Sequence, residues 1–203
     1  MKVNNYPVKT PAAGDRLFGS DSNGDQKQFD MSAVSNNVFQ YEIGEYVEDQ
    51  GGVIFHRYLD GNTQNYLVVG LSNLSTSQVW SNVASTLIGS TAQSTWDGLS
   101  NSNAIVSQVG QTSSAAKLCL DSTANSKTDW YLPAIQELNL LWTNRFDIDK
   151  SISSIVGSSA MGVDTFWSST ETTSTFATTF NIQYGTSLKN VSNYVRAIRK
   201  FSI

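Results

Sequence analysis

The sequence predicts an α+β domain preceded by an extended N-terminal arm. Two runs rich in β-branched and aromatic residues, 53–59 and 66–71, are separated by Asp60-Gly61-Asn62, a pattern typical of a β-hairpin. Two later segments, 103–120 and 133–142, carry apolar residues at helical spacing. We therefore expect short strands and two to three helices within residues 44–203, and an arm over residues 1–43.

The arm differs in composition from the rest of the chain. Pro7 and Pro11 oppose helix formation, and glycines interrupt the short segments that follow. Its few apolar residues cannot build a core of their own, so the arm needs a partner surface to bury them. Those residues are Leu17, Phe18, Phe29, Met31 and Val34. The alternative is a loose terminal tail.

Residues 21–25 of the arm place oxygen-bearing side chains at alternate positions, as calcium-binding loops do. An EF-hand would need Gly at its sixth position and Glu at its twelfth, where the chain has Gln26 and Ser32. Asn and Gly tolerate positive φ, so a tight turn through Asn23-Gly24 is the better interpretation.

The predicted helices each have an apolar face. Segment 103–120 would bury Ile105, Val109, Ala116 and Leu120 on one face. The second helix would start with Pro133 in its first turn and bury a further apolar set, namely Ile135, Leu138, Leu141 and Trp142. A third short helix over 147–156 would carry isoleucines 148, 152 and 155 on one face.

Composition argues against several classes of function. Of the 203 residues 15% are charged and the net charge is −4, so no basic stripe supports nucleic-acid binding. No segment reaches the length of a membrane span, and residues 1–7 lack the apolar run of a signal peptide, so we expect a product made in the cytoplasm without membrane insertion. Cys119 is the only cysteine, which excludes an intrachain disulfide.

Catalysis also has little support. His56 is the only histidine and is predicted on the solvent side of its strand, opposite Phe55. Neither Asp147 with Asp149 nor Glu45 with Glu48 is placed across a cleft, and the aspartates are expected to stabilise a helix start. We therefore expect no enzyme activity, no metal and no cofactor.

The segment Thr172 to Asn193 is nearly uncharged and rich in Thr, Ser, Asn and Gly, with isolated Phe and Tyr. Such composition is typical of binding loops. It lies between Phe166-Trp167-Ser168-Ser169-Thr170-Glu171 and Tyr194-Val195-Arg196-Ala197-Ile198-Arg199, which read as rigid blocks. The sequence thus predicts a fixed frame that holds a permissive surface.

Several blocks together resemble the Lcl C-terminal domain family over about residues 44–203. They are Tyr46 to Phe55, Trp80, Ala115-Ala116 through Cys119, Asp129-Trp130-Tyr131-Leu132-Pro133, Glu137 to Leu141, Phe166 to Glu171 and Val195 to Phe201. The resemblance implies a C-type-lectin-like fold that presents a loop-rich ligand face without enzyme activity. The Glu-Pro-Asn and Gln-Pro-Asp tripeptides of calcium-dependent sugar-binding lectins do not occur here.

Members of that family are similar to the variable proteins of diversity-generating retroelements, in which the segment between the two rigid blocks is mutated at adenines. By position, the resemblance implies a variable or ligand-facing set. It comprises Thr172, Thr173, Thr175, Phe176, Thr178, Thr179, Asn181, Tyr184, Ser187, Asn190, Ser192 and Asn193. The ligand would be a host-surface glycan or protein.

Residues 13–30 of the arm resemble the opening segments of fibre proteins in phages of gut bacteria. This resemblance implies a virion protein, exposed on the particle, that is attached to the head or tail through residues 1–43 and assembles as a homotrimer. A purely structural decoration protein and a bacterial surface adhesin remain alternatives, although an adhesin would need an export signal.

Tryptophans and arginines of the rigid blocks are expected to serve the frame. Trp130, Trp142 and Trp167 are predicted to lie in the core, and Arg196 and Arg199 to tie the last strand to its neighbours. Trp80 and Trp96 flank a stretch of small polar residues, so each could project from a loop or fold back onto the domain.

Overall fold

The computed structural model describes residues 16–20, 23–30 and 39–203. The chain divides into two compact units, Met1–Gln40 and Tyr41–Ile203. In the first unit, β1 (Arg16–Ser20) and β2 (Gln26–Asp30) pair as an antiparallel hairpin. The chain turns at Asn23-Gly24, as predicted, and Gly24 adopts a φ of +86°, which glycine accepts without strain. Residues 21–22 of the calcium-like stretch, and Met31 and Val34, lie outside the described residues.

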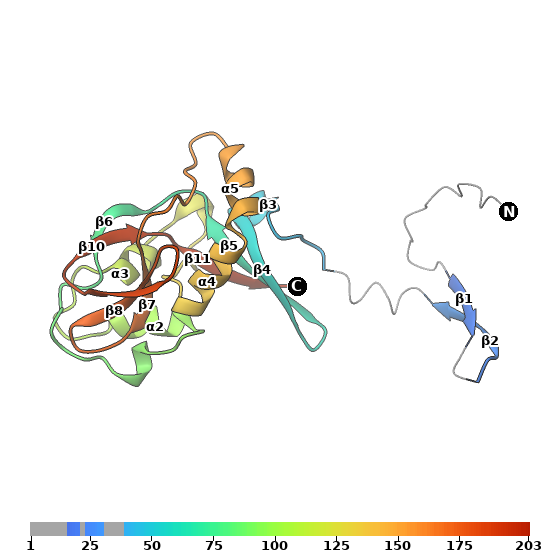
Figure 1. Cartoon of the computed structure of the whole chain (residues 1–203), viewed down its shortest axis with the longest axis horizontal. Helices are drawn as coiled ribbons and strands as arrows, with labels where there is room; N and C mark the ends of the chain where they lie inside the picture. Colours follow the sequence, from blue (N-terminus) through green and yellow to red (C-terminus); the bar gives the residue numbers. More distant parts are fainter. Residues whose placement is uncertain (1–15, 21–22, 31–38) are drawn as a thin grey trace. The chain divides into compact units, whose positions relative to one another are not determined.

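The second unit is a mixed α+β domain with two curled sheets, which confirms the predicted class (Figure 1). The four-stranded sheet has the order β11-β5-β4-β3, formed by Ile198–Ser202, Thr63–Gly70, Gly52–Asp60 and Tyr46–Val47. The five-stranded sheet has the order β6-β10-β7-β8-β9, formed by Ser75–Val79, Ser192–Val195, Phe166–Glu171, Phe176–Phe180 and Tyr184–Leu188.

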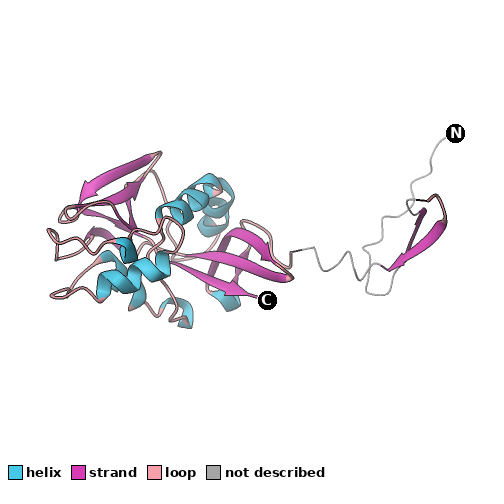
Figure 2. Cartoon of the chain, turned by 90° about the horizontal axis from the view of Figure 1, so that it is seen from below, coloured by secondary structure: helices cyan, strands magenta, loops and turns pink. Residues whose placement is uncertain are grey.

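The described residues form four α-helices and three short 3-10 helices. The α-helices are α2 (Gly98–Val106), α3 (Ala115–Leu120), α4 (Ile135–Thr143) and α5 (Arg145–Ser153). The 3-10 helices are η1 (Glu48–Gln50), η2 (Ser90–Ala92) and η3 (Ala124–Ser126). Helix α4 contacts β4 of one sheet and β7 and β8 of the other, and Figure 2 shows the helices gathered between the two groups of strands.

The β4–β5 hairpin forms where it was predicted. Asp60 pairs with Thr63 across a two-residue turn in which Gly61 has a φ of +58°. The register shifts between Ile54 and His56, and this irregularity separates the buried start of β4 from its more exposed end. His56 is half-buried and stacks on Tyr58, whereas Phe55 is fully buried, so the predicted solvent side of His56 is partly covered.

The helix predicted over 103–120 is two helices. Helix α2 ends at Val106 and α3 begins at Ala115, after a loop in which Gly110 has a φ of +81°. Val109 is 94% exposed in that loop, so its helical spacing was accidental. A residue at positive φ cannot continue a right-handed helix, and glycine adopts that conformation more readily than residues with a Cβ.

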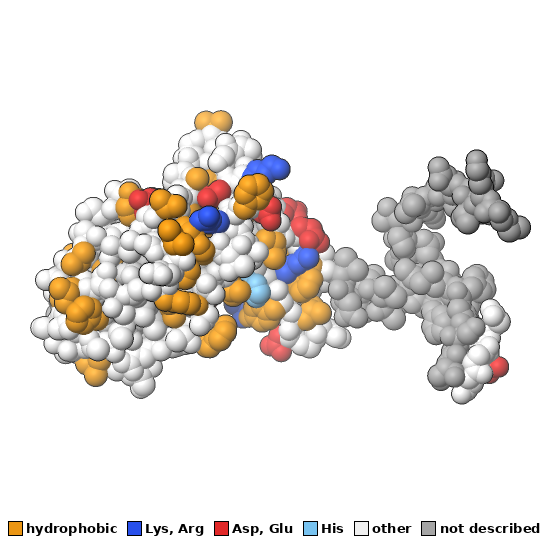
Figure 3. Space-filling view, viewed as in Figure 1, with side chains coloured by type: hydrophobic (Ala, Val, Ile, Leu, Met, Phe, Trp, Pro, Cys, Tyr) orange, Lys and Arg blue, Asp and Glu red, His pale blue; other side chains and the backbone are white. Residues whose placement is uncertain are grey.

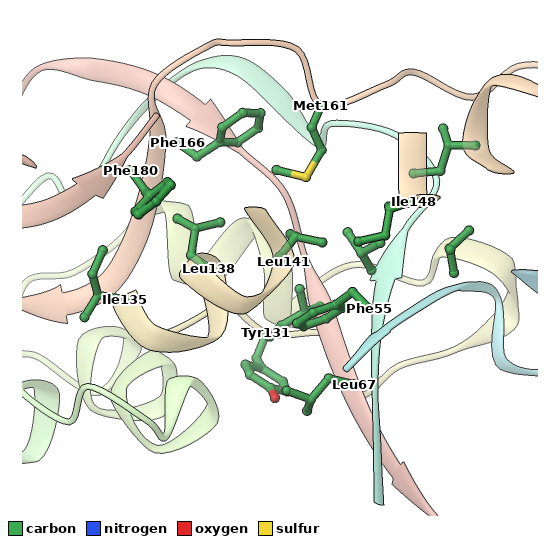
Figure 4. Packing of buried hydrophobic residues seen from close by; sticks show 14 residues of the cluster. Phe55, Leu67, Tyr131, Ile135, Leu138, Leu141, Ile148, Met161, Phe166 and Phe180 are labelled. Carbon is green, nitrogen blue, oxygen red and sulfur yellow. The ribbon is translucent and has the colours of Figure 1, made fainter. Parts of the chain in front are cut away.

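The core lies between α4 and the two sheets. Figure 4 shows Leu138 and Leu141 of α4 among aromatic side chains that include Phe166, Phe180 and Phe55. Burial of such side chains stabilises the fold by roughly 1.5–3 kcal/mol each. Helix α4 begins at Ile135, so Pro133 precedes it rather than lying in its first turn.

The third helix, α5, contributes to the same core. It spans Arg145–Ser153 and so begins two residues earlier than the predicted 147–156. Ile148 and Ile152 are buried on one face, as predicted, but the helix ends at Ser153, so the prediction that Ile155 belongs to this face was wrong. Asp147 lies in the first turn, whereas the Asp149 carboxylate accepts a bond of 2.9 Å from the Met161 N–H and ties the helix to the following loop.

Candidate binding surface

The candidate site is the surface of the segment Thr172–Asn193, which contains β8, β9 and the turns around them. Strand β7 precedes it and is buried along its whole length. Strand β8 pairs with β7 on one side and with β9 on the other, and β9 lies at the edge of the sheet. The segment therefore leaves a buried strand, passes through the exposed edge strand β9 and ends in β10, which lies between β6 and β7.

The twelve predicted ligand-facing residues fall into three groups. Six are exposed, namely Thr172, Thr173, Phe176, Tyr184, Asn190 and Ser192. Five are half-buried, namely Thr175, Thr178, Asn181, Ser187 and Asn193. Thr179, which pairs with Trp167 of β7 and Gly185 of β9, is 4% exposed, so it is not a surface residue.

Hydrogen bonds fix the turn between β7 and β8. The N–H groups of Thr172 and Thr173 both donate to the carbonyl of Phe176, at 3.0 and 3.1 Å. The Thr173 hydroxyl accepts from the N–H groups of Thr175 and Phe176. Thr178 donates to the carbonyl of Thr170 at 3.1 Å and is hydrogen-bonded to Ser168. The exposed Thr173 thus fixes the turn, and the half-buried Thr178 ties β8 to β7.

A buried ion pair supports the surface from beneath. Lys189 Nζ lies 2.6 Å from Glu171 Oε1, and neither side chain is exposed to solvent. The same ammonium donates to the carbonyls of Thr86 and Ser174, at 3.2 and 2.9 Å, and lies 4.8 Å from the centre of the Trp80 ring. Its three N–H donors are all used, which offsets part of the cost of burying the charge.

The Glu171 carboxylate extends the same network into the loop before α2. It accepts bonds from the N–H groups of Ile88 and Gly89, at 3.0 and 2.8 Å. One ion pair therefore links the end of β7, the 86–89 loop and the turn after β9. The reasoning from sequence missed this pair, although Lys189 is the only charged residue between Thr172 and Asn193.

The frame residues lie as predicted, with one exception. Trp130 and Trp167 are fully buried, and so is Trp80, whereas Trp142 is only partly buried. The Trp80 and Trp167 indole N–H groups donate to the carbonyls of Ser168 and Gln78, each at 2.8 Å. Trp96, in contrast, is 68% exposed.

The two arginines of the last block hold loops to the end of the chain. Arg196 donates to the carbonyls of Gly70 and Ser159, each at 2.8 Å. Burial lowers the pKa of Arg196 to about 10. Arg199 makes two bonds of 2.7 Å to Asp129, and the guanidinium lowers the pKa of that carboxyl against the opposing effect of its partial burial. Both arginines serve the frame.

Few groups of the kind used in catalysis meet on this surface. Among the described residues, no three His, Cys, Asp or Glu side chains are close enough together to hold a metal ion. Glu45 accepts a bond of 2.8 Å from the N–H of Glu42 and is exposed.

In the part of the chain that the structure describes, no helix is long and apolar enough to cross a membrane.

Comparison with models of known protein families gives no match for this chain, and comparison with curated proteins gives none either.

Proposed function

We propose that the chain is a non-enzymatic virion fibre protein of a phage, on the head or the tail, whose C-terminal domain binds a host-surface glycan or protein. Residues 1–43 attach it to the particle. The observation that carries the proposal is the Thr172–Asn193 surface, in which exposed uncharged side chains lie above a fully buried ion pair. A rigid base loses little conformational entropy when its surface binds a ligand.

The composition of the surface suits recognition of varied epitopes. Phe176 and Tyr184 are 38% and 50% exposed and offer apolar area at a small entropy cost. Thr172, Asn190 and Ser192 add hydrogen-bonding groups without charge. Substitutions at the exposed positions of such a surface would leave the frame intact, as the resemblance to retroelement variable proteins requires.

The frame also supports a C-type-lectin-like arrangement within the α+β class. The blocks that carry the family resemblance meet in space: Arg199 binds Asp129, and Trp80 binds the Ser168 carbonyl. The last strand, β11, pairs with β5 of the β4–β5 hairpin, so the end of the domain lies beside one of its first strands. We propose this fold and this family on those grounds.

The test is cell attachment by the full-length protein, measured with a fluorescent label on the bacterial strain that propagates the phage. One variant carries Asn190→Glu and Ser192→Glu, which place charge on the surface. The matched control carries Asn62→Glu and Ser153→Glu, at exposed positions outside the segment. We expect the first pair to reduce attachment by at least about tenfold and the second to leave it unchanged.

Deletion of residues 1–40, the first compact unit, tests the other half of the proposal. Particles that carry the truncated protein should lose it, while the isolated protein should still bind cells. If the Asn190→Glu/Ser192→Glu variant binds cells normally and truncation abolishes incorporation into particles, the chain is a structural decoration protein. Cell binding by an exported form in the absence of particles would favour the adhesin.

A further inference from the structure

The second unit contains a cavity of about 590 Å³ between the four-stranded sheet, α4 and the start of α2. Its lining includes His56 and Tyr58 of β4, Lys200 of β11, Glu137 of α4, and Trp96 and Asp97 before α2. The volume lies within the range of about 300–1,000 Å³ typical of small-molecule sites. None of the twelve predicted ligand-facing residues lines it.

One wall of the cavity is aromatic and open to solvent. Trp96 is 68% exposed, whereas Trp80, Trp130 and Trp167 are fully buried. Nearby Leu99 is 44% exposed and lines the same cavity. Figure 3 shows the single histidine of the chain, in pale blue, on a face where hydrophobic side chains gather. An exposed indole beside a cavity provides a flat apolar surface for a ring.

The position of Trp96 is fixed by its neighbours. The backbone N–H of Trp96 donates to the Ser94 hydroxyl at 3.2 Å, and the backbone carbonyl of Thr95 accepts from the backbone N–H of Gln136 at 2.9 Å. The next residue, Asp97, caps α2 by accepting from the Ser100 N–H at 2.9 Å. The indole is therefore carried by an ordered backbone between α2 and α4, which favours binding because less entropy is lost.

The cavity lining carries both signs of charge. Lys200 Nζ lies 5.2 Å from the centre of the Tyr58 ring, and Asp97 contributes a carboxylate. Burial lowers the pKa of His56 below its usual value and so favours the neutral imidazole. Burial also raises the pKa of Glu137 to about 7, so that side chain is only partly ionised. A cationic ligand would face Lys200, and an anionic one would face Asp97.

The carboxyl of Glu137 is already held by three donors. The Tyr131 hydroxyl and the Ala134 N–H each donate to it at 2.8 Å, and the Gly98 N–H donates at 3.1 Å. It needs no cation from a ligand to satisfy it. Hydrogen-bonding groups remain at the imidazole of His56, the phenol of Tyr58 and the ammonium of Lys200, next to the acceptor Asp97.

We propose that this cavity binds one neutral sugar ring, with the apolar face of the ring against Trp96 and its hydroxyls toward Asp97, His56 and Lys200. A pyranose has a flat C–H face and several hydroxyls that both donate and accept, and it matches a lining with an aromatic wall and balanced charge. The site is separate from the Thr172–Asn193 surface and does not depend on that surface binding a host.

The test uses the ¹⁵N-labelled full-length protein and follows its tryptophan indole N–H signals by NMR. The probes are the methyl glycosides of glucose, galactose, mannose and N-acetylglucosamine, each up to about 100 mM, well above a Kd near 1 mM. Glucosamine and glucuronate serve as charged probes. We expect at least one neutral glycoside to shift the Trp96 signal saturably. The Trp80, Trp130 and Trp167 indoles donate to internal carbonyls and should not shift.

Two variants then locate the site by calorimetry. Trp96→Ala should weaken the binding of the best glycoside by at least about tenfold. The matched control is Phe146→Ala, which removes an aromatic side chain that is 76% exposed outside the cavity. This variant should bind as the parent does.

Three results would overturn the proposal: no saturable shift with any neutral glycoside, an equal or larger response to a charged probe, or unchanged binding by Trp96→Ala. The Asn190→Glu/Ser192→Glu variant should keep its affinity for the glycoside even if it fails to bind cells. Failure of this proposal and failure of the proposed function are therefore distinguishable.

Discussion

Lys189 and Glu171 form an ion pair of 2.6 Å in which both side chains are fully buried, directly beneath the proposed binding surface. The two residues flank the β8–β9 hairpin in sequence, so the pair closes the base of that hairpin. It also holds the 86–89 loop through bonds from Glu171 and Lys189 to backbone groups. The surface thus has an electrostatic anchor that is itself hidden from any ligand.

Removal of one member of this pair should be costly. We expect Lys189→Ala to lower the free energy of unfolding by about 3–5 kcal/mol, because the Glu171 carboxylate would remain buried without its partner. Lys117→Ala is the control, since its pair with Asp121 is largely exposed and should contribute less than about 1 kcal/mol. Urea denaturation measures both. If both substitutions lower the free energy of unfolding by the same amount, burial does not increase the contribution of the Lys189–Glu171 pair to stability.

The raised pKa of Glu137 predicts that the stability of the protein depends on pH. Its pKa is raised to about 7 in the folded state, mainly by burial, and returns to its ordinary value near 4.5 on unfolding. The folded state therefore binds the proton more tightly, so this contribution is complete below about pH 4.5 and is lost as pH rises to about 7. The full effect is about 3 kcal/mol.

The measurement is urea denaturation of the parent and of Glu137→Gln from pH 4 to pH 8 at constant salt. The parent should lose stability relative to the variant across that range. His56 acts in the opposite direction, because its folded pKa is lowered, but its effect is common to both proteins and cancels in the difference. A difference that does not change with pH would refute the role assigned to Glu137.

Cys119 should be inert in the folded protein. It is fully buried, and burial raises the pKa of its thiol well above the usual range, so the reactive thiolate is scarce. We expect an aromatic disulfide reagent to modify it in urea but not in buffer, at a rate that follows unfolding. The absorbance of the released thiolate provides the readout. Rapid modification in buffer would mean that α3 opens readily.

Trimer formation is a prediction of the fibre model. The full-length protein should be a trimer by light scattering, and a protein lacking residues 1–40 should be a monomer, because the arm's apolar residues need external burial. The second unit has its own core, so it should remain folded without the arm. A full-length monomer, or a trimer that survives the truncation, would contradict the assignment of assembly to the arm.

The features that the sequence predicted well are local ones. The hairpin at Asp60-Gly61-Asn62 followed from turn chemistry and β-branched runs, and α4 followed from the spacing of Ile135, Leu138 and Leu141. The break between α2 and α3 was missed because Val109 matched the helical spacing by chance. Gly110 was the available signal, since a glycine inside a helical pattern often marks its end.

The long-range features could not be predicted in the same way. The sequence left open whether Trp80 and Trp96 project or fold back, because the structure of the loop that carries Trp96 depends on α4 through the bond between Thr95 and Gln136. Thr179 was grouped with its exposed neighbours because composition does not show which face of a strand a residue occupies. Lys189 was detectable only as an isolated charge in an uncharged segment.

Burial along β8 also limits how many distinct surfaces this chain can present. Ala177, Thr179 and Phe180 of that strand are buried, and Lys189 is held by Glu171. Random change spread evenly over residues 172–193 would often strike one of these positions and yield a chain that does not fold. An engineered library confined to Thr172, Thr173, Phe176, Tyr184, Asn190 and Ser192 would be smaller, yet it would contain a larger share of usable binders.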